Sequence, residues 1–439
     1  MAESGPRREL PPGAKPGAAS QAGPRIIAPQ TGPTTGILPI QVLRELLRVG
    51  EIVTATPLAA NQLQPASLDL RLGAKAHRVR AGFLPGRRRQ VAEAAAEFGL
   101  HEIDLTGGAV LETGCVYIVE LQESLALSPA LAGWANPKSS IGRLDVFVRL
   151  IVDHATEFDR VPAGYKGPLF AEISPQTFPV LVRQGSRLNQ LRLGRGSSTA
   201  NDAALRAVHA EIGLVGEAPS GAPGGAPGGA PGGAPGGAPG EGSGATTVRK
   251  ATLDLTIDLS GDPTSGPGGG LGSGPGAGLV GFRARRHTAL IDVDRVGAYE
   301  PAAFWDPLPA DPARRLILDP NEFYILRSRE PVKVPPDYAA EMVAYDTQIG
   351  EFRAHYAGFF DPGFGYRAAD GSRDNQGTRA VLEVRSHKVP FILEHGQIVG
   401  RLVYERMAGA PDELYGAGMG SSYQAQGLKL SKHFKAFSP

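Results

Sequence analysis

The chain has 439 residues, enough for about two domains that each bury their own core. Its 45 Lys and Arg nearly balance 44 Asp and Glu, and the net charge of +1 argues against electrostatic capture of nucleic acid or an acidic membrane surface. A single cysteine, Cys115, excludes an internal disulfide framework and a Cys-rich zinc site, and it is compatible with a reducing compartment.

Residues 1–35 are basic and rich in Pro and Gly, a composition typical of a disordered tail, and they lack the apolar core of a secretory signal. No apolar run approaches the roughly 18–20 residues that a membrane-spanning helix needs. We therefore expect a soluble, cytoplasmic protein that has no membrane or nucleic-acid partner.

The first predicted domain, residues 36–215, opens with a short amphipathic helix at 39–50. Leu43, Leu46 and Leu47 recur there at helical spacing, between a Pro and a Gly that suit the two helix ends. Short apolar or alternating runs then predict strands at 68–73, 116–121, 146–152, 169–173 and 180–182. Short strands at this density, punctuated by Gly and Pro, favour a barrel or jelly roll over a βαβ sheet.

The first domain is predicted to end in a helix at 201–215, with one side formed by Ala203, Ala204, Val208 and Ile212. A Gly-Ala-Pro-Gly repeat at 216–246 then has the composition of a linker that cannot bury a core. The second predicted domain, 247–414, contains another Gly-rich run, at about 261–278, which we expect to be a disordered loop. Its strands are predicted at 253–259, 279–283, 289–293, 322–326, 341–345, 380–384, 389–393 and 398–404. The Gly/Ser-rich, basic residues 415–439 are predicted to form a mobile arm that closes over a ligand.

The two domains are predicted to be copies of one β-rich unit. Stretches 167–193 and 377–405 match at four pairs of residues, each 211 positions apart: Glu172 and Glu383, Pro179 and Pro390, Gly185 and Gly396, and Leu191 and Leu402. Upstream, Tyr117 matches Tyr324 at an offset of 207. Each copy therefore carries a glutamate at the same place.

Glu172 and Glu383 are candidates for chemistry, because a carboxylate inside an apolar strand is costly unless it is paired or used. A structural ion pair and a general base are both compatible with this pattern.

A turn at 138–143 is a second candidate. Its sequence, Lys138-Ser139-Ser140-Ile141-Gly142-Arg143, offers hydroxyls and cations that suit phosphate oxygens, although a solvated basic turn fits the composition as well. The second copy has Asp346 and Glu351 where Lys138 and Arg143 stand, and these acids would repel a polyphosphate. If either copy binds phosphates through this turn, it is the first.

A third candidate belongs to the second copy. Asp361-Pro362-Gly363-Phe364 is a turn sequence, and on its own it predicts only a turn. Together with Glu383 it could position a ligand beside a general base. The first copy has Pro162 where Asp361 stands.

These residues resemble the dCTP deaminase family of the dUTPase-like superfamily, in a tandem-duplicated form. The resemblance runs through QPASLDLRLG (64–73), KSSIGR (138–143), DPGF (361–364), the glutamate strands and YQAQG (423–427), and it covers most of both copies. It implies an all-β dominated chain of two dUTPase-like distorted jelly-roll or β-barrel domains with a few short helices. Family members usually form trimers with sites between barrels, so the resemblance implies a homo-oligomer or a pseudo-oligomer of the duplicated domains.

The resemblance also implies an activity and roles for residues. The family hydrolyses the 4-amino group of dCTP to give dUTP and ammonia, without zinc, and the strand glutamate is the general base. Lys138, Ser139, Ser140 and Arg143 are implied to bind the phosphates. Asp361 and Phe364 are implied to lie against the pyrimidine, and Tyr423 and Gln426 to close over the nucleotide. Mg²⁺ is implied to arrive with the triphosphate, and dTTP is a possible effector.

The sequence departs from the family in ways that suggest a division of labour. The Ser-Ser-x-x-Arg turn is present only in the first copy and the Asp-Pro-Gly turn only in the second. Asp159 and Gly358 replace a histidine that the family has just upstream of that turn, and Ser422 replaces the lysine before the Tyr of the arm. We therefore expect one composite site, in which Glu383 is favoured over Glu172 as the base.

Two alternatives stay open. The first is a dUTP diphosphatase, or a bifunctional enzyme that releases dUMP, in which Asp361 activates a water toward the α-phosphate. The second is a nucleotide-binding regulator without catalysis.

Overall fold

A computed structural model describes residues 35–216, 248–249, 252–261, 278–344, 352–354, 358–366, 377–386, 388–416 and 427–437. Contacts divide the chain into Met1–Pro33 and Thr34–Pro439, and all described residues belong to the second unit. The predictions for the tail, for nearly all of the linker and Gly-rich loop, and for Tyr423 and Gln426 fall outside the described residues.

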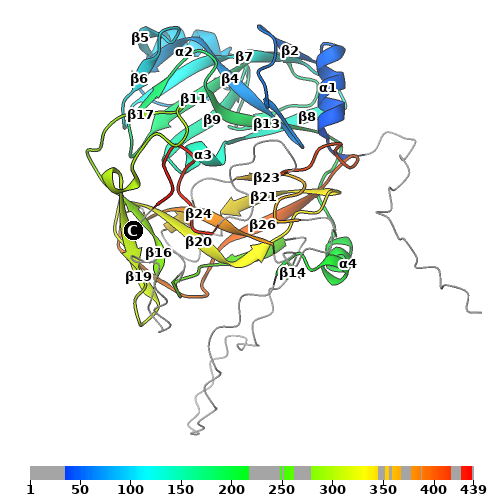
Figure 1. The fold of residues 1–439 in the computed structure, drawn as a ribbon. Coiled ribbons are helices and arrows are strands. Elements are labelled where there is room, and N and C mark those ends of the chain that lie inside the picture. The colour runs from blue at the N-terminus through cyan, green and yellow to red at the C-terminus, as the bar shows by residue number, and fades with distance from the viewer. Residues whose placement is uncertain are drawn as a thin grey trace, which may run out of the picture. The chain divides into compact units, whose positions relative to one another are not determined.

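Most described strands of the first copy form one curved sheet, which runs from blue to green in Figure 1, while the strands Ala109–Leu111 and Val180–Val182 pair with each other in a separate sheet. The described strands of the curved sheet pair in the order β10-β8-β13-β4-β7-β11-β9, and β1, β2, β3 and β5 attach beside this path. The elements are β1 (Gly36–Ile37), α1 (Ile40–Arg48), β2 (Ile52–Thr54), β3 (Leu63–Gln64), β4 (Ser67–Val79), α2 (Val91–Phe98), β5 (Gly99–Asp104), β6 (Ala109–Leu111), β7 (Val116–Ala126), β8 (Leu131–Pro137), α3 (Ser139–Gly142), β9 (Val146–Val152), β10 (Arg160–Val161), β11 (Lys166–Pro175), β12 (Val180–Val182), β13 (Arg187–Arg195) and α4 (Asp202–Ile212).

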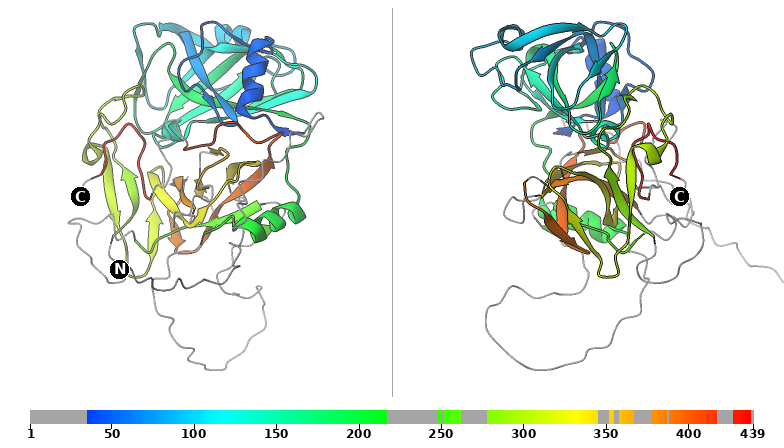
Figure 2. Two further views of the ribbon diagram at one scale, coloured as in Figure 1. Left: turned by 45° about the vertical axis from the view of Figure 1, so that its right-hand side comes forward. Right: turned by 90° about the vertical axis from the view of Figure 1, so that its left-hand side faces the viewer.

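The second copy divides most of its described strands between two sheets, β14-β15-β26-β21-β23 and β18-β16-β20-β24-β22. Residues of both sheets pack into one hydrophobic core, and Figure 2 shows the strands curling around it. The elements are β14 (Val248–Arg249), β15 (Thr252–Thr256), β16 (Leu279–Ala284), β17 (Ile291–Asp292), η1 (Pro301–Ala303), β18 (Trp305–Pro309), β19 (Arg315–Leu318), β20 (Phe323–Val332), β21 (Tyr338–Ala344), β22 (Phe352–Ala354), β23 (Phe359–Phe360), β24 (Thr378–Ser386), β25 (Phe391–Glu394) and β26 (Ile398–Arg406). The predicted fold class is confirmed.

The two copies are joined by backbone pairing and by a shared core. Strand β17 of the second copy runs parallel to β12 of the first, where Val180 pairs with Ile291. A hydrophobic cluster unites residues of the first copy with Trp305, Phe323 and Ile325 of the second. The copies therefore form a continuous body across which one site can be built.

The local sequence explains why these helices and strands form. In α1, Leu43 and Leu46 are buried and Leu47 is half-buried, as the helical spacing predicts. In β4, Leu68, Leu70 and Leu72 alternate with the polar residues Ser67, Asp69 and Arg71, and both faces of the strand are buried there. The described runs predicted as strands all overlap strands, with shifts of boundary.

The predicted face of the helix at 201–215 needs a correction. The Asn201 side chain accepts a hydrogen bond from Ala204 N and caps α4, which ends at Gly213 in the left-handed region. Leu205 is the buried residue, Val208 and Ile212 pack beside it, and Ala203 is exposed. The larger leucine removes more apolar surface from water than an alanine does, and this sets the rotation of the helix.

Strand registers repeat between the copies as the sequence offsets predict. Glu172 pairs with Ile118 in the first copy, and Glu383 pairs with Ile325 in the second. The Tyr117 hydroxyl accepts a hydrogen bond from Glu112 N, and the Tyr324 hydroxyl accepts one from Asp319 N. The glutamates therefore occupy equivalent positions on equivalent strands. No helix in the described ranges is long and apolar enough to cross a membrane.

Candidate active site

The turn at 138–143 is buried, so its interpretation as a solvated basic turn is wrong. Strand β8 ends at Pro137, and the single helical turn α3 follows from Lys138. The backbone of the turn is fixed because Lys138 N donates to Leu188 O on β13, and Arg143 N donates to Ser139 O. Ser140 and Arg143 are 4% and 3% exposed. A guanidinium at this depth needs a partner of opposite charge or several acceptors.

Glu383 faces Arg143 across the two copies. It lies on β24, is 4% exposed, and its Oε1 is 3.6 Å from Arg143 Nε. Burial raises the pKa of Glu383 from 4.5 to about 7, and the Arg143 cation opposes that rise. The strand glutamate of one copy and the arginine of the other therefore form a buried pair whose carboxylate titrates near neutrality.

Arg143 also contacts the C-terminal segment that follows the predicted arm motif. Its Nη1 donates to Lys429 O at 3.0 Å, and the Ser431 hydroxyl donates to Ser140 O at 2.6 Å. Burial, and next the nearby Lys138 cation, lower the pKa of Lys432. Residues 429–432 thus lie against the turn.

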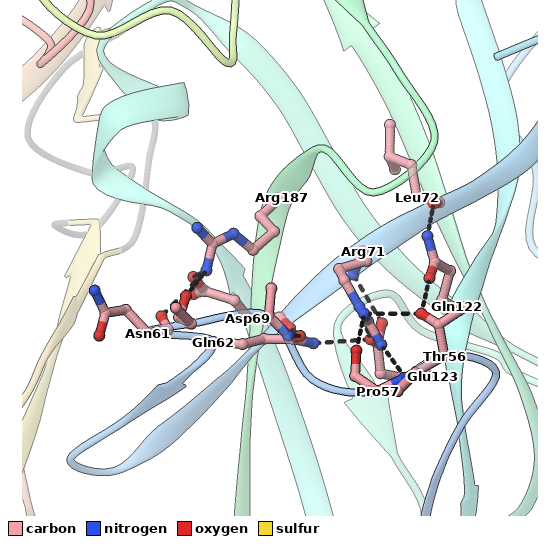
Figure 3. A network of polar contacts seen from close by, with 12 residues as sticks. Thr56, Pro57, Asn61, Gln62, Asp69, Arg71, Leu72, Gln122, Glu123 and Arg187 are labelled. Carbon is pink, nitrogen blue, oxygen red and sulfur yellow. Dashed lines mark hydrogen bonds and ion pairs between the residues drawn. The ribbon is translucent and has the colours of Figure 1, made fainter. Parts of the chain in front are cut away.

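Asp69 joins two cations beside this turn. Its Oδ2 pairs with Lys138 Nζ and lies 3.5 Å from Arg187 Nη1, while its buried Oδ1 has no hydrogen-bond partner among the described residues. Figure 3 shows Arg187 and Asp69 beside a buried network in which Gln62 links the Asp69 carbonyl to Glu123. The network holds this part of β4 rigid. Sequence analysis quoted Asp69 within QPASLDLRLG but assigned it no role.

The Asp-Pro-Gly turn is anchored by an arginine that sequence analysis missed. Arg192 on β13 is fully buried, and its Nη2 donates to Asp361 Oδ1 at 3.0 Å and to Phe360 O at 2.9 Å. Its guanidinium also lies over the Phe359 ring, 4.0 Å from the centroid. Burial raises the pKa of Asp361, and Arg192 opposes the rise.

Phe364 and Gly363 of the Asp-Pro-Gly turn have structural roles. Phe364 is 5% exposed and packs against Phe360 and Tyr415 in the core of the second copy. Gly363 has a φ of +99°, and a Cβ there would lie 2.9 Å from Tyr415 N, so glycine is required. Gly358, where the family has a histidine, lies beside Ser139: a Cβ at this position would be 3.9 Å from the Ser139 hydroxyl.

Glu172 occupies the equivalent position in the first copy but has a different environment. Burial raises the pKa of Glu172, and the cation that opposes the rise is Arg149, an exposed residue on the neighbouring strand. A Cβ at Gly82 would lie 2.6 Å from Glu172 Oε2, so the loop at Gly82 covers the carboxylate. Asp159 nearby has a pKa raised to about 7 by burial. The structure gives Glu172 no counterpart of the Arg143 pair among the described residues.

The site therefore brings together Lys138, Ser140, Arg143, Asp69 and Glu383. The Ser139 hydroxyl lies beside the backbone of Gly358. Asp361 lies within electrostatic reach of Lys138, and Phe364 lies in the core behind it. The described residues contain no group of three or more His, Cys, Asp or Glu that could hold a metal ion.

Two family models match the chain. The model for the N-terminal domain of 2'-deoxycytidine 5'-triphosphate deaminase matches residues 34–197, and the model for its C-terminal domain matches residues 252–434. The crystal structure of 2'-deoxycytidine 5'-triphosphate deaminase from Agrobacterium tumefaciens is 49% identical, with a TM-score of 0.73, and the match covers 86% of this chain and 100% of that one.

Curated relatives match over about a third of this chain. A "dCTP deaminase, dUMP-forming" of Beutenbergia cavernae is 29% identical over 154 residues, which are 34% of this chain and 74% of that protein. A protein of the same description from Acidothermus cellulolyticus is 32% identical over 152 residues, with the same two shares. A "dCTP deaminase" of Halorubrum lacusprofundi is 32% identical over 133 residues, 30% of this chain and 62% of that protein.

Proposed function

Because the chain belongs to the dCTP deaminase family, we propose that it hydrolyses the 4-amino group of dCTP at one composite site, with Glu383 as the general base. The observation that carries this proposal is the buried Arg143–Glu383 pair, in which each copy supplies one partner. The second copy has Glu351 where Arg143 stands. Glu172, the first copy's equivalent of Glu383, forms no ion pair with Arg143, so the observed pair depends on the association of the copies.

The protonation of Glu383 suits the reaction. A water that attacks C4 must lose a proton, and the ring and the departing amine must gain protons. A carboxyl with a pKa near neutrality is able to accept the first proton and return it, because either form is accessible at physiological pH. Such transfers contribute roughly 10²–10⁴-fold, so positioning of dCTP must supply much of the remaining acceleration.

Arg143 and Lys138 have separate tasks in this proposal. Arg143 keeps Glu383 oriented and holds its pKa lower than burial alone would, so that the carboxylate is available as a base. Lys138, Arg187 and Lys432 gather around Asp69 and supply positive charge for the triphosphate. Ser139 and Ser140 lie between these two regions.

Magnesium is proposed as part of the substrate. Asp69 is a poor ligand for the ion because Lys138 and Arg187 already pair with its carboxylate, so the triphosphate itself would hold the Mg²⁺. Bound there, the ion would neutralise phosphate charge. We propose that the reaction needs no zinc, as the resemblance to the family implies.

The product is the point on which two candidates differ. Deamination alone gives dUTP, whereas the Beutenbergia and Acidothermus relatives are described as dUMP-forming. A second step would need a water activated at the α-phosphate. Asp361 is poorly suited to that step because its carboxylate is buried and bound to Arg192. We therefore favour dUTP as the product and keep dUMP as the second candidate.

The test is to incubate the protein with dCTP and Mg²⁺ and to measure ammonia, pyrophosphate and the nucleotide product together. Ammonia with dUTP supports the proposal. Ammonia with equal pyrophosphate and dUMP supports the second candidate. Tight dCTP binding without ammonia overturns both and identifies a nucleotide-binding regulator, and repeating the assay with dTTP tests it as an effector.

A further inference from the structure

The segment after the predicted arm motif is docked at two ends. Leu430 and Phe434 are 5% and 6% exposed within the hydrophobic core. The backbone between and beside them is held to the second copy, because Gly297 N donates to Lys432 O and Ala298 N donates to His433 O, both at 2.9 Å. Residues 430–434 are therefore positioned by packing and backbone bonds before any nucleotide binds.

This docked segment holds the backbone of the turn at 138–143 through Ser431. The bonds formed inside the turn use the carbonyls of Lys138, Ser139, Ile141 and Gly142, while the Ser140 carbonyl accepts from the Ser431 hydroxyl. Ser140 is buried, and a buried carbonyl without a donor is costly. The hydroxyl of Ser431 therefore fixes the middle of the turn.

His433 offers the same hydroxyl a second acceptor. Its Nε2 is 2.8 Å from Val293 O, which can only accept, so Nε2 carries the proton of the neutral ring. Its Nδ1 is then an acceptor, 2.8 Å from the Ser431 hydroxyl oxygen. Burial lowers the pKa of His433 to about 4, which keeps the ring neutral under ordinary conditions. The Ser431 hydroxyl has a single proton to share between two acceptors, and the Ser140 carbonyl, at 2.6 Å, is nearer than Nδ1, at 2.8 Å.

We propose that Ser431 is a positioning residue for deamination: it anchors the turn at 138–143 to the second copy and so keeps Arg143 against Glu383. This inference rests on the proposed function. Arg143 is the last residue of the turn, its backbone N–H donates to Ser139 O within the turn, and its side chain also donates to Lys429 O, next to the docked segment. A shift of the turn therefore moves the guanidinium that faces Glu383.

Displacement of Arg143 changes the pKa of Glu383 in a defined direction. Arg143 is the cation that lowers the pKa of Glu383, and the other charges close by are Lys429 next to Arg143 and the Arg385–Asp145 pair on the same strand face. When Arg143 is displaced, the pKa of Glu383 rises. The acid limb of the pH profile of kcat/KM then moves to higher pH.

The experiment compares Ser431→Ala and Ser431→Thr with the wild type. Ser431→Ala should lower kcat/KM about tenfold at pH 7, mainly through kcat, and raise the acid limb by about 0.5–1 pH unit. Ser431→Thr keeps the hydroxyl and should restore both values. The matched control is Ser386→Ala, which removes a buried hydroxyl bonded to the Val389 carbonyl at 2.6 Å. Ser386 lies on the opposite face of β24 from Glu383, so its loss should lower stability without moving the acid limb.

A loss of activity in Ser431→Ala with an unmoved acid limb, or the same shift in Ser386→Ala, overturns the inference. If the wild type releases no ammonia, the proposed function has failed, and the crystal structure of Ser431→Ala decides the inference instead. Displacement of Arg143 from Glu383 then supports the anchoring, and an unchanged pair contradicts it.

Discussion

Glu383→Gln should stabilise the folded protein at alkaline pH while it stops the reaction. The pKa of Glu383 is raised from 4.5 to about 7 because the carboxyl is buried. Below pH 4.5 the group is protonated in both the folded and the unfolded state, and it costs no stability. As pH rises toward 7, the unfolded chain releases a proton that the folded state retains, so the free energy of unfolding falls.

The size of this effect follows from the shift. A change from 4.5 to about 7 corresponds to about 3 kcal/mol, since one pKa unit is about 1.4 kcal/mol. Glutamine has nearly the same shape and carries no charge, so the variant escapes the penalty. Its free energy of unfolding should match that of the wild type at about pH 4.5 and exceed it by about 3 kcal/mol above pH 8.

Urea denaturation of both proteins across this pH range measures the difference directly. Glu211→Gln, on the exposed side of α4, is the control and should show no pH-dependent gain. A difference between the Glu383→Gln variant and the wild type that stays constant with pH would refute the reasoning, because it would mean that the folded state does not raise the pKa of Glu383.

Three further predictions concern the cations of the site. Arg143→Lys should retain the positive charge but lose the fixed geometry of the guanidinium. The acid limb of the pH profile of kcat/KM should therefore stay within about 0.5 pH unit of the wild type while kcat falls. A rise of the limb by more than about one pH unit would contradict this. Arg192→Met should leave the Asp361 carboxylate buried without its partner. Urea denaturation should then show a free energy of unfolding lower by about 3–5 kcal/mol. The control Arg206→Met breaks an exposed ion pair and should change this free energy by less than about 1 kcal/mol. Lys138→Ala should raise the KM for dCTP more than it lowers kcat, and this loss should shrink at high salt; an unchanged KM would remove Lys138 from the phosphate site.

Much of the fold could be predicted because the sequence repeats itself. Alternation and short apolar runs located the strands, and the offset between Glu172 and Glu383 identified equivalent positions before the pairing registers were known. The same comparison predicted which copy contributes the turn at 138–143. The strand inferences succeed because a strand with one buried face has a fixed side-chain period.

The partners inside the site could not be predicted, because they come from opposite copies. Arg143 was assigned to phosphates from its residue type, and nothing local indicates that Glu383, 240 positions away, lies beside it. Arg192 was missed since it stands in an alternating strand where a charged residue is usually exposed. One signal was present: the second copy has Val403 at the equivalent position, so an arginine in only one copy marked a specialised residue.

The amino-acid composition did not predict that residues 430–434 pack against the rest of the chain. A basic, Gly/Ser-rich end predicts a mobile arm, yet this end also contains Leu428, Leu430 and Phe434, and the last two are buried. The burial of those apolar side chains outweighs the charge of the lysines between them, which extend toward the site.

The division of labour between the copies is tested most directly by ammonia release from dCTP in Glu383→Gln and Glu172→Gln, assayed side by side with the wild type. Glu383→Gln should lose on the order of 10²–10⁴-fold in kcat, whereas Glu172→Gln should stay within about threefold of the wild type. Equal losses in the two variants would contradict a single composite site and show that both glutamates serve the reaction.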